Sequence, residues 1–538
     1  MKRVLGAAAR TSALVSALIS ALAAVSGCGV RGKDPSSVIT RRLEGEPKTL
    51  NPLLTNTDPE SIVAALVARN LLDYDESLNL IPGLAESIED SGDHLTYTVH
   101  LRDARWEDGT PVTSADVAYT LKALVDPKTP PTARRSNFDA LKAVEAVDAR
   151  TARVVFTAPY AYRKDAFNLP LLPAALYAGK DIATNERNRS PLANGPYRLA
   201  KWDAGRAIEL VRNTQYFGEK PPAERIVLRV VPETAPAFQG LLTGELDETR
   251  LTPEQLKRID ADRDKPGATA HSLVWDELAY TYIAWNNRLP QFSEAKVRRA
   301  LTMLIDREVI ARTIYGGLAK PANGPVPPGL WTYDPALAPW PFDPAAASRL
   351  LDEAGWRKGP DGVRRKGKDR FAFTLSLGAG SDLQRQIVEL AQQTYRAAGI
   401  EMNIRPMEWA SFSANFEAGD FEAAAIALNL DPNPDMTANW HSAQIPPIGV
   451  NSVFYKSPKA DALMDELKTT FDRGRAKELY KELQRVIHED EPVSFLHIVS
   501  LKWGITRRIE NVKTSPIGLS LFWPGVSGWR PVRATRPI

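Results

Sequence analysis

The chain has 538 residues, of which 43% are hydrophobic and 25% are charged, and its formal net charge is +3. This length exceeds the roughly 250–300 residues at which a single hydrophobic core stops growing, so we expect two lobes or more. The densest basic run, at 364–368, lies in a glycine-rich turn, and this distribution argues against a nucleic-acid-binding surface.

The start of the chain has the pattern of an export signal. Basic side chains accompany an Ala- and Leu-rich stretch at 11–25, which is short for a membrane span of about 20 apolar residues. The sequence Val-Ser-Gly-Cys that ends at Cys28 resembles the bacterial lipobox, in which a peptidase cuts before the cysteine and lipid is attached to its sulfur. Cys28 is the only cysteine, so the exported chain would form no disulfide.

We therefore predict a lipoprotein signal peptide at 1–27, lipidation of Cys28 and a flexible spacer at 28–37. The lipid would hold the protein on the extracytoplasmic face of the cell membrane, in the periplasm or at the cell surface. A free thiol is the alternative for Cys28. The motif occurs in Gram-positive and Gram-negative envelopes and does not distinguish them.

Strand-like and helix-like patterns alternate along the first half of the chain. Residues 94–102 alternate apolar and polar side chains, as in a half-buried strand. Thr113 and Asp116 can form a capping box in front of a helix. Residues 152–159 and 207–213 are further strand candidates, and the alternation favours an α/β fold.

The second half contains a βαβ pattern. A strand at 371–377, a helix that begins at Ser381 and a strand at 400–407 predict a parallel pair of strands. Glu294 and Arg298 have the i,i+4 spacing that allows an ion pair across one helical turn. Further helices are predicted at 293–305, 343–354, 458–471 and 475–488, and a last strand at 493–499.

No pattern in the sequence is typical of an enzyme. The histidines are not spaced with cysteines or carboxylates as in a zinc site, and no G-x-S-x-G motif occurs. Residues 362–368 have phosphate-loop spacing, but Asp369 replaces the required Ser or Thr, so a hairpin turn is the better interpretation. We predict no catalytic residue, no metal site and no cofactor. A secreted hydrolase is an alternative that no motif supports.

Several blocks in order resemble family 5 of the bacterial extracellular solute-binding proteins, the oligopeptide-, dipeptide- and nickel-binding components of ABC importers. They include GEPKTLNPLLTNTDPES, ARWEDGTPVTSADVAYTL, NGPYRLAKWDAGRAIELVRN, FDPAAASRLLDEAGW and EWASFSANFEAGDFEAA. The resemblance covers nearly all of the chain after the leader.

This resemblance implies a two-lobed, periplasmic-binding-protein-like α/β fold of the type II, cluster C kind. Lobe one would comprise 38–284 with an inserted subdomain near 76–189, and the chain would return to it at 510–538. Lobe two would comprise 285–509. Two crossing segments would form a hinge, and the lobes would close around a ligand.

The resemblance also implies ligand-binding residues. In the oligopeptide binders, the positions of Trp409 and Asp431 line the pocket and pair with the peptide's α-ammonium, respectively. The early loop that contacts the peptide corresponds to Asn56, Thr57 and Asp58. Weaker candidates are Trp440 and Asn286. For Asp431, a turn residue before Pro432 is the alternative.

This sequence also departs from the oligopeptide pattern. Phe416 and Ala425 stand at positions that are Arg in that pattern, and Leu428 stands at a Trp position. These replacements make the expected pocket more apolar and leave the length and class of the ligand open.

The implied function is that of a monomeric, lipid-anchored receptor of an ABC importer, which captures oligo- or dipeptides and delivers them to a membrane permease powered by a separate ATPase. A nickel chelate, an opine or a sugar-like solute is the alternative ligand class. A sensor lipoprotein that uses closure to contact a partner is a further alternative.

Overall fold

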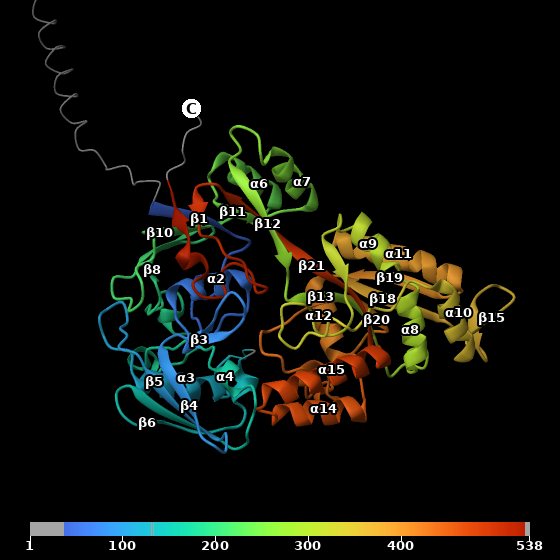
Figure 1. Cartoon of the computed structure of the whole chain (residues 1–538), viewed down its shortest axis with the longest axis horizontal. Coiled ribbons are helices and arrows are strands. Elements are labelled where there is room, and N and C mark those ends of the chain that lie inside the picture. Colours follow the sequence, from blue (N-terminus) through green and yellow to red (C-terminus); the bar gives the residue numbers. More distant parts are fainter. Residues whose placement is uncertain (1–36, 131, 133, 533–538) are drawn as a thin grey trace, which may run out of the picture.

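The computed structural model of the protein describes residues 37–130, 132 and 134–532. The predicted signal peptide, Cys28 and all of the predicted spacer except its last residue lie outside these described residues. Figure 1 shows two lobes side by side, one formed mainly by the first half of the chain and the other mainly by the second half. The C-terminal segment up to residue 532 lies against the first lobe.

One 12-stranded sheet runs through both lobes in the order β19-β18-β20-β13-β21-β11-β1-β10-β9-β8, and β12 and β14 also pair with β21. The strands on the lobe-one side are β1 (Val38–Leu43), β8 (Tyr197–Asp203), β9 (Ala207–Arg212), β10 (Arg225–Val230), β11 (Glu248–Arg250) and β12 (Ala270–Asp276). Those on the lobe-two side are β13 (Ala279–Trp285), β14 (Ala319–Pro321), β18 (Ala372–Gly378), β19 (Glu401–Met407) and β20 (Ala423–Asn429).

Strand β21 (Val493–Thr506) belongs to both lobes. Its first part pairs with β13 and β14, and its second part pairs with β11 and β12. The connection between β12 and β13, at residues 277–278, is the other crossing segment. We therefore place the change of lobe at residues 277–278 and near residues 499–500, before the positions expected from sequence, because β13 lies wholly in lobe two and β21 runs through both lobes.

A subdomain of lobe one lies within the expected insertion. Its four-stranded antiparallel sheet has the order β4-β5-β7-β6 and is packed against α3. These elements are β4 (Ala85–Asp90), β5 (Thr96–Leu101), β6 (Leu141–Ala146), β7 (Thr151–Phe156) and α3 (Ser114–Val125). The predicted capping box of Thr113 and Asp116 begins α3. Tyr97, Leu121 and Phe156 are buried in the core of the subdomain.

Other elements of lobe one surround the central sheet. Helix α2 (Asp58–Val67) faces lobe two, and α6 (Thr234–Thr243) and α7 (Pro253–Asp262) pack near β11 and β12. The shorter elements are β2 (Leu72–Tyr74), β3 (Leu80–Pro82), α4 (Arg163–Ala166), α5 (Ala174–Tyr177), β22 (Ile509–Glu510) and β23 (Arg530–Pro531).

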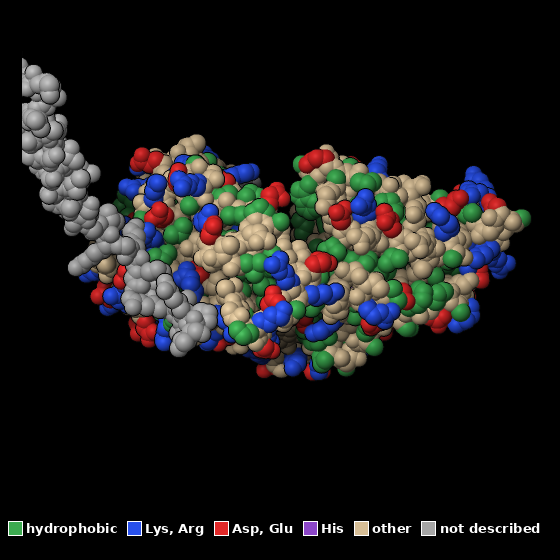
Figure 2. All heavy atoms as spheres, turned by 90° about the horizontal axis from the view of Figure 1, so that it is seen from above, with side chains coloured by type: hydrophobic (Ala, Val, Ile, Leu, Met, Phe, Trp, Pro, Cys, Tyr) green, Lys and Arg blue, Asp and Glu red, His purple; other side chains and the backbone are tan. Residues whose placement is uncertain are grey.

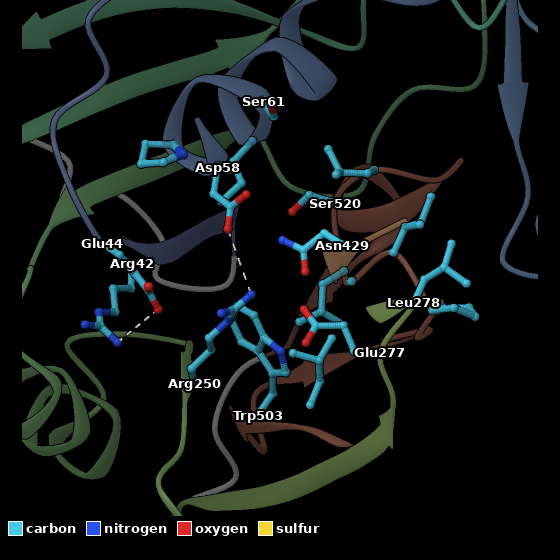
Figure 3. Close-up of a pocket in the computed structure, with 18 of the residues that line it drawn as sticks. Arg42, Glu44, Asp58, Ser61, Arg250, Glu277, Leu278, Asn429, Trp503 and Ser520 are labelled. Carbon is cyan, nitrogen blue, oxygen red and sulfur yellow. Dashed lines mark ion pairs between the residues drawn. The ribbon is translucent and has the colours of Figure 1, made fainter. Parts of the chain in front are cut away.

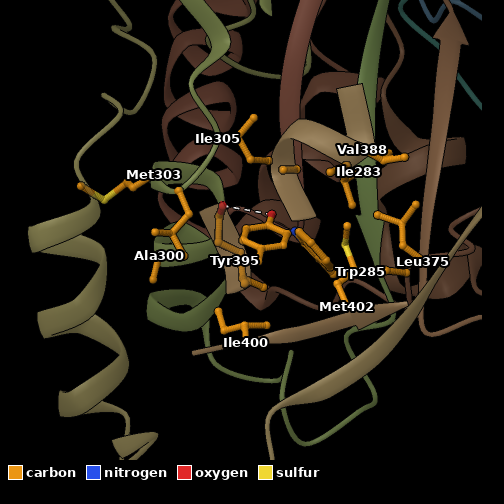
Figure 4. Packing of buried hydrophobic residues seen from close by; sticks show 14 of the residues in the cluster. Ile283, Trp285, Ala300, Met303, Ile305, Leu375, Val388, Tyr395, Ile400 and Met402 are labelled. Atoms are coloured by element: carbon orange, nitrogen blue, oxygen red, sulfur yellow. Dashed lines mark hydrogen bonds between the residues drawn. The ribbon is translucent and has the colours of Figure 1, made fainter. Parts of the chain in front are cut away.

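Lobe two contains the predicted βαβ unit. Strands β18 and β19 pair in parallel, and α11 (Asp382–Ala398) connects them. Side chains from these elements and from α8 (Ala295–Met303) and α10 (Pro344–Glu353) form one core, whose centre Figure 4 shows. Trp285 and Tyr395 are fully buried there, and the Tyr395 hydroxyl donates a hydrogen bond to the Leu301 carbonyl at 3.1 Å.

The opposite face of the lobe-two sheet packs against a second set of helices. These are α12 (Trp409–Ala418), α13 (Thr437–Trp440), α14 (Pro458–Lys468) and α15 (Arg473–Asp490), while α9 (Arg307–Thr313) lies beside β14. Strands β15 (Arg357–Lys358), β16 (Arg364–Lys366) and β17 (Asp369–Arg370) form a small antiparallel sheet. This arrangement confirms the predicted hairpin turn at 362–368.

The predicted ion pair between Glu294 and Arg298 is wrong. Glu294 is the N-cap residue outside α8 and pairs with Lys366 at 2.8 Å. Arg298 is buried, and its guanidinium donates hydrogen bonds to the carbonyls of Phe292, Asp490 and Glu491. Helix α8 directs the Arg298 side chain into the protein. There its guanidinium provides hydrogen-bond donors to the last carbonyl groups of α15, so Arg298 stabilises the fold.

The subdomain touches lobe two directly. The Tyr160 hydroxyl donates to Asp435 Oδ2 at 2.7 Å, and the Ala161 amide donates to the Lys468 carbonyl at 2.7 Å. The rings of His94 and Phe471 stack with centroids 3.5 Å apart. The lobes are therefore linked at the far end of the cleft from the hinge. In the part of the chain that the structure describes, no helix has the length and hydropathy needed to cross a membrane.

Candidate functional site

Three adjoining cavities of about 200, 240 and 340 Å³ lie between the lobes. Ser61 on α2 borders all three, and Asp431, which follows β20, borders the second and third. Seen from above, a notch separates the two lobes, and hydrophobic side chains lie inside it (Figure 2). Together the cavities have a volume typical of small-ligand sites, roughly 300–1,000 Å³.

The first cavity is beside the hinge and contains charged groups from several elements (Figure 3). Arg250, on β11, lies 4.0 Å from the Asp58 carboxylate, and its guanidinium sits 5.7 Å from the ring centre of Trp503. Glu277, in the crossing segment, also faces this cavity. Burial raises the pKa of Glu277, while Arg250 lowers it and Asp58 raises it further. The remaining walls are largely apolar, with Leu278 among them.

Asp431 is held by a local turn. Its Oδ1 accepts a hydrogen bond from the Asn433 amide at 3.0 Å, the pattern of an Asx turn. Asp431 is exposed to solvent in the cleft, and its enclosure by the two lobes raises its pKa, while the Asn433 amide and the Arg134 guanidinium lower it. Among the residues that the structure describes, none forms an ion pair with Asp431. The turn thus points a carboxylate into the cleft without neutralising it.

One acidic and one basic side chain also lie near Asp431, and the sequence alone identified neither of them. Asp165, on α4, accepts a hydrogen bond from the Tyr74 hydroxyl at 2.8 Å. Burial, with a contribution from Asp431, raises the pKa of Asp165 to about 6, although the Tyr74 hydrogen bond lowers it. Arg134 donates to Thr55 Oγ1 at 3.4 Å and lines the second and third cavities. No motif surrounds Asp165 or Arg134, so no local signal could have identified them.

The predicted loop before α2 lines the third cavity. Asn56, Thr57 and Asp58 all border it, opposite Asp431. The amides of Asn56 and Thr57 donate to Glu60 Oε2 at 2.8 and 3.1 Å, which fixes the loop through the capping box of α2. The structure therefore brings these three predicted residues and Asp431 to one cleft.

The other predicted residues lie elsewhere. Trp409, at the start of α12, is 58% exposed and borders none of the three cavities. Asn286 is 3% exposed and donates to the carbonyls of Gly419 and Phe421, so it tethers the chain after α12. Trp440 is 4% exposed and borders a fourth cavity, in lobe two.

The structure offers no metal centre in the part that it describes. No group of three or more His, Cys, Asp or Glu side chains among residues 37–130, 132 and 134–532 is arranged to hold a metal ion.

Two lobes that share one sheet, two crossing segments and a charged cleft between the lobes define a solute-binding protein of the periplasmic type. The chain belongs to the bacterial extracellular solute-binding proteins, family 5, because the model of the family's middle region matches residues 79–445. Members of this family are the solute-binding subunits of ABC importers and are not enzymes.

Relatives and solved structures are similar over most of the chain. The oligopeptide-binding protein AppA of Bacillus subtilis (strain 168) is 28% identical over 487 residues, which cover 88% of each chain. The glutathione-binding protein GsiB of Pectobacterium atrosepticum is 28% identical over 493 residues, covering 88% of this chain and 91% of that protein.

The structure of Bacillus subtilis AppA in complex with a nonapeptide has a TM-score of 0.77 at 26% identity and covers 92% of this chain and 99% of that one. NikZ from Campylobacter jejuni, in complex with Ni(L-His), has a TM-score of 0.79 at 23% identity and covers 92% of this chain and 100% of that one.

Proposed function

We propose that this protein captures peptides in the interlobe cleft and delivers them to the permease of an ABC importer. The observation that carries the proposal is Asp431, a carboxylate that faces the cleft without an ion-pair partner among the described residues. The likeness to an oligopeptide-binding protein whose structure holds a nonapeptide supports it.

Asp431 would pair with the α-ammonium of the peptide. A charge-assisted hydrogen bond is about twice as strong as a neutral one, and a cleft that excludes water strengthens it. The peptide backbone, extended between the lobes, would bond to exposed backbone groups along the cleft walls. Asn56, Thr57 and Asp58 lie on the opposite wall and would contact the first residues of the peptide.

Capture would proceed by closure of the lobes at the hinge. Closure brings the subdomain against lobe two, where the contact between Tyr160 and Asp435 forms. The closed protein, a monomer, would then dock on a permease whose ATPase drives transport. The predicted lipid on Cys28 would keep the protein on the extracytoplasmic face of the membrane.

A non-peptide solute is the second candidate ligand. Phe416 and Ala425 favour it, because they stand where the oligopeptide pattern has the guanidiniums that would hold a peptide's acidic groups, and Leu428 stands where that pattern has Trp. The structure of NikZ in complex with Ni(L-His) shows that this fold holds a metal chelate in a relative. An opine or a sugar-like solute belongs to the same alternative.

Native mass spectrometry of residues 29–538, purified without refolding, tests the proposal. Release under denaturing conditions of a series of short peptides is the expected result. One discrete non-peptide mass would replace the peptide proposal with the second candidate. If the protein is empty, binding of a random tetrapeptide library decides, and no retained peptide would refute the proposal.

The lipid anchor has a separate test. Full-length protein expressed in a bacterium should fractionate with membranes and carry an acylated Cys28 by mass spectrometry. Cys28→Ser should move it to the soluble fraction. An unmodified thiol in the wild-type protein would refute the anchor and leave the peptide proposal standing.

A further inference from the structure

The subdomain of lobe one and the helices of lobe two meet at the far end of the cleft from the hinge. Residues 160–162, which follow β7, reach into lobe two, where Tyr162 is 6% exposed within the hydrophobic core. The hydroxyls of Tyr162 and Tyr480, on α15, are hydrogen-bonded at 2.7 Å. The two lobes are therefore joined here by packed side chains and not only by polar groups at the surface.

The subdomain is fixed to lobe one by a shared core. Leu53, Leu54, Leu71 and Leu72 of lobe one belong to the same hydrophobic cluster as the buried side chains of the subdomain. Opening of the lobes at the hinge would therefore carry the subdomain away from lobe two and break the contacts between them. Whatever strengthens these contacts raises the population of the closed state.

One contact between the lobes contains a titratable ring. His94 lies in the turn between β4 and β5, and its amide donates a hydrogen bond to the Ser91 carbonyl at 2.9 Å. Phe471 lies in the turn between α14 and α15 of lobe two. The two rings are nearly parallel, with an angle of 10° between their planes and centroids 3.5 Å apart. The turn of the subdomain thus places an imidazole flat against an aromatic face of the other lobe.

The His94 ring also has carboxylates beside it from its own lobe. Its Nδ1 lies 2.8 Å from Asp90 Oδ2, on β4, and Asp93 lies in the same turn. These groups belong to the subdomain, so they accompany the ring whether the lobes are open or closed. Asp90 therefore stabilises a protonated His94 in both states, and the difference between the states comes from lobe two.

The charged residues in the turn of lobe two are engaged within that lobe. Lys468 pairs with Asp465 at 3.0 Å, and Asp472 is the N-cap residue of α15. The Arg473 guanidinium lies 4.7 Å from the ring centre of Trp331. Lobe two thus presents to His94 chiefly the face of the Phe471 ring.

An aromatic face attracts a cation, and a protonated imidazole is a cation. Histidine changes its charge between about pH 8 and pH 5. Since the stack exists only in the closed state, protonation favours closure, and closure favours protonation to the same extent. The His94 and Phe471 side chains are 31% and 38% exposed, and at such exposure the attraction changes an equilibrium constant by about two- to fivefold.

We propose that the stack of His94 on Phe471 is a pH-sensitive latch between the lobes, which favours the closed state of the protein as the pH falls. The latch acts without ligand, so it goes beyond the proposed function and is independent of whether the ligand is a peptide. Protonation of Asp431 also lowers the cost of closing without ligand, so the effect of His94 is isolated by comparing variants at the same pH.

Distances between the lobes in the ligand-free protein test the latch. Residues 29–538 contain no cysteine, so spin labels can be attached at Lys142→Cys on β6 and at Lys477→Cys on α15, both exposed positions. From about pH 8 to about pH 5.5, the ratio of closed to open protein should rise about two- to fivefold more in wild type than in His94→Phe. This variant keeps a ring on Phe471 but takes up no proton. Equal increases in the two proteins would overturn the proposal.

His100→Phe is the matched control. His100 lies on β5 of the same sheet, its side chain is 36% exposed, and its Nε2 lies 3.6 Å from Glu89 Oε1. The substitution thus removes a histidine beside a carboxylate of the subdomain, and the ratio of closed to open protein should respond to pH as in wild type. A response that His100→Phe weakens as much as His94→Phe would assign the effect to the overall charge of the subdomain and overturn the latch.

The proton affinity of His94 provides a second measurement, which needs no open population. The pH midpoint of the His94 ring signals is followed by NMR in wild type and in Phe471→Leu, which keeps an apolar contact but removes the aromatic face. The midpoint should be lower in the variant by about 0.3–0.7 pH units, the equivalent of a two- to fivefold change in proton affinity. If only the closed state is populated at every pH, this comparison decides, and identical midpoints would overturn the proposal.

Discussion

Replacement of Asp431 by Asn should abolish most of the affinity for a peptide with a free amine. The substitution removes the negative charge but keeps an oxygen at the position that accepts the Asn433 amide at 3.0 Å, so the turn remains. The lobes should therefore fold as before, and the ligand's ammonium loses its charged partner.

The magnitude follows from the surroundings of the carboxylate. A hydrogen bond to a charged group contributes about 1.5–3 kcal/mol, and loss of one partner of a buried charge pair costs about 2–5 kcal/mol. Asp431 is exposed to solvent in this structure, and a bound ligand would displace the water that hydrates its carboxylate. We therefore expect a loss of about 3 kcal/mol, which is on the order of a 100-fold weaker Kd.

Isothermal titration of a tetrapeptide at pH 7 measures this effect. Asp382→Asn is the matched control, because Asp382 lies on α11 of the same lobe, has a side chain that is 80% exposed and pairs with Arg385. Acidification protonates Asp431 and should weaken peptide binding by the wild-type protein. Because the pKa of Asp431 is raised, this loss of affinity should begin at a higher pH than the usual pKa of an aspartate would give. Asp431→Asn should show no such loss. An N-acetylated peptide that binds as well as the free amine, or a change in Kd below threefold, would refute the reasoning.

Three other changes have defined outcomes. Arg41→Ala should destabilise the fold by about 3–5 kcal/mol in urea unfolding, because it leaves Glu248 charged and fully buried after loss of a 3.0 Å ion pair; a loss below 1 kcal/mol would contradict this. Burial raises the pKa of Glu491 to about 8, so the folded protein retains a proton that the unfolded chain releases, and stability falls as pH rises from about 4.5 to 8. Glu491→Gln should remove this fall. The free energy of unfolding of the variant, relative to that of wild type, should therefore increase as pH rises through this range. A difference that stays constant with pH would contradict the reasoning. Tyr160→Phe removes the 2.7 Å hydrogen bond to Asp435 between the lobes, so ligand affinity should drop about fivefold and X-ray scattering should show a larger radius of gyration; unchanged scattering and affinity would show that this contact does not hold the lobes together.

Local signals in the sequence predicted much of the fold. The capping box at Thr113 and the βαβ unit around α11 depend on residues that are close in sequence, and both were confirmed. The length of β21 was not predictable in this way. Residues 493–499 gave an apolar strand, but the seven residues that follow alternate less clearly and become a strand only because β11 and β12 lie beside them.

The cleft depends on contacts between distant segments, which composition and periodicity do not report. Asp165 and Arg134 approach Asp431 from more than two hundred residues away in sequence, and Glu277 enters the first cavity only because the hinge lies there. From the sequence, Asp431 could be interpreted as a turn residue or as the residue that pairs with the ligand's amine. The Asx turn and the position in the cleft show that the two are compatible, since the turn is what orients the carboxylate.

The charge on Asp431 also provides a physical reason for closure to depend on ligand. When the lobes separate, water hydrates the carboxylate freely, and full closure without ligand would remove part of that water while the charge gains no ion-pair partner among the described residues. A ligand ammonium compensates the cost only in the closed state, so it has the differential affinity that a shift between two conformations requires. Arg134 lowers this cost only partly. Burial disfavours the charged form of Arg134 and lowers its pKa, and its guanidinium donates a hydrogen bond to Thr55. In Asp431→Asn the cost of closing without ligand is smaller, so the unliganded variant should scatter X-rays as a more compact particle than the unliganded wild type. An unliganded variant as extended as wild type would mean that the carboxylate selects the ligand and has no part in closure.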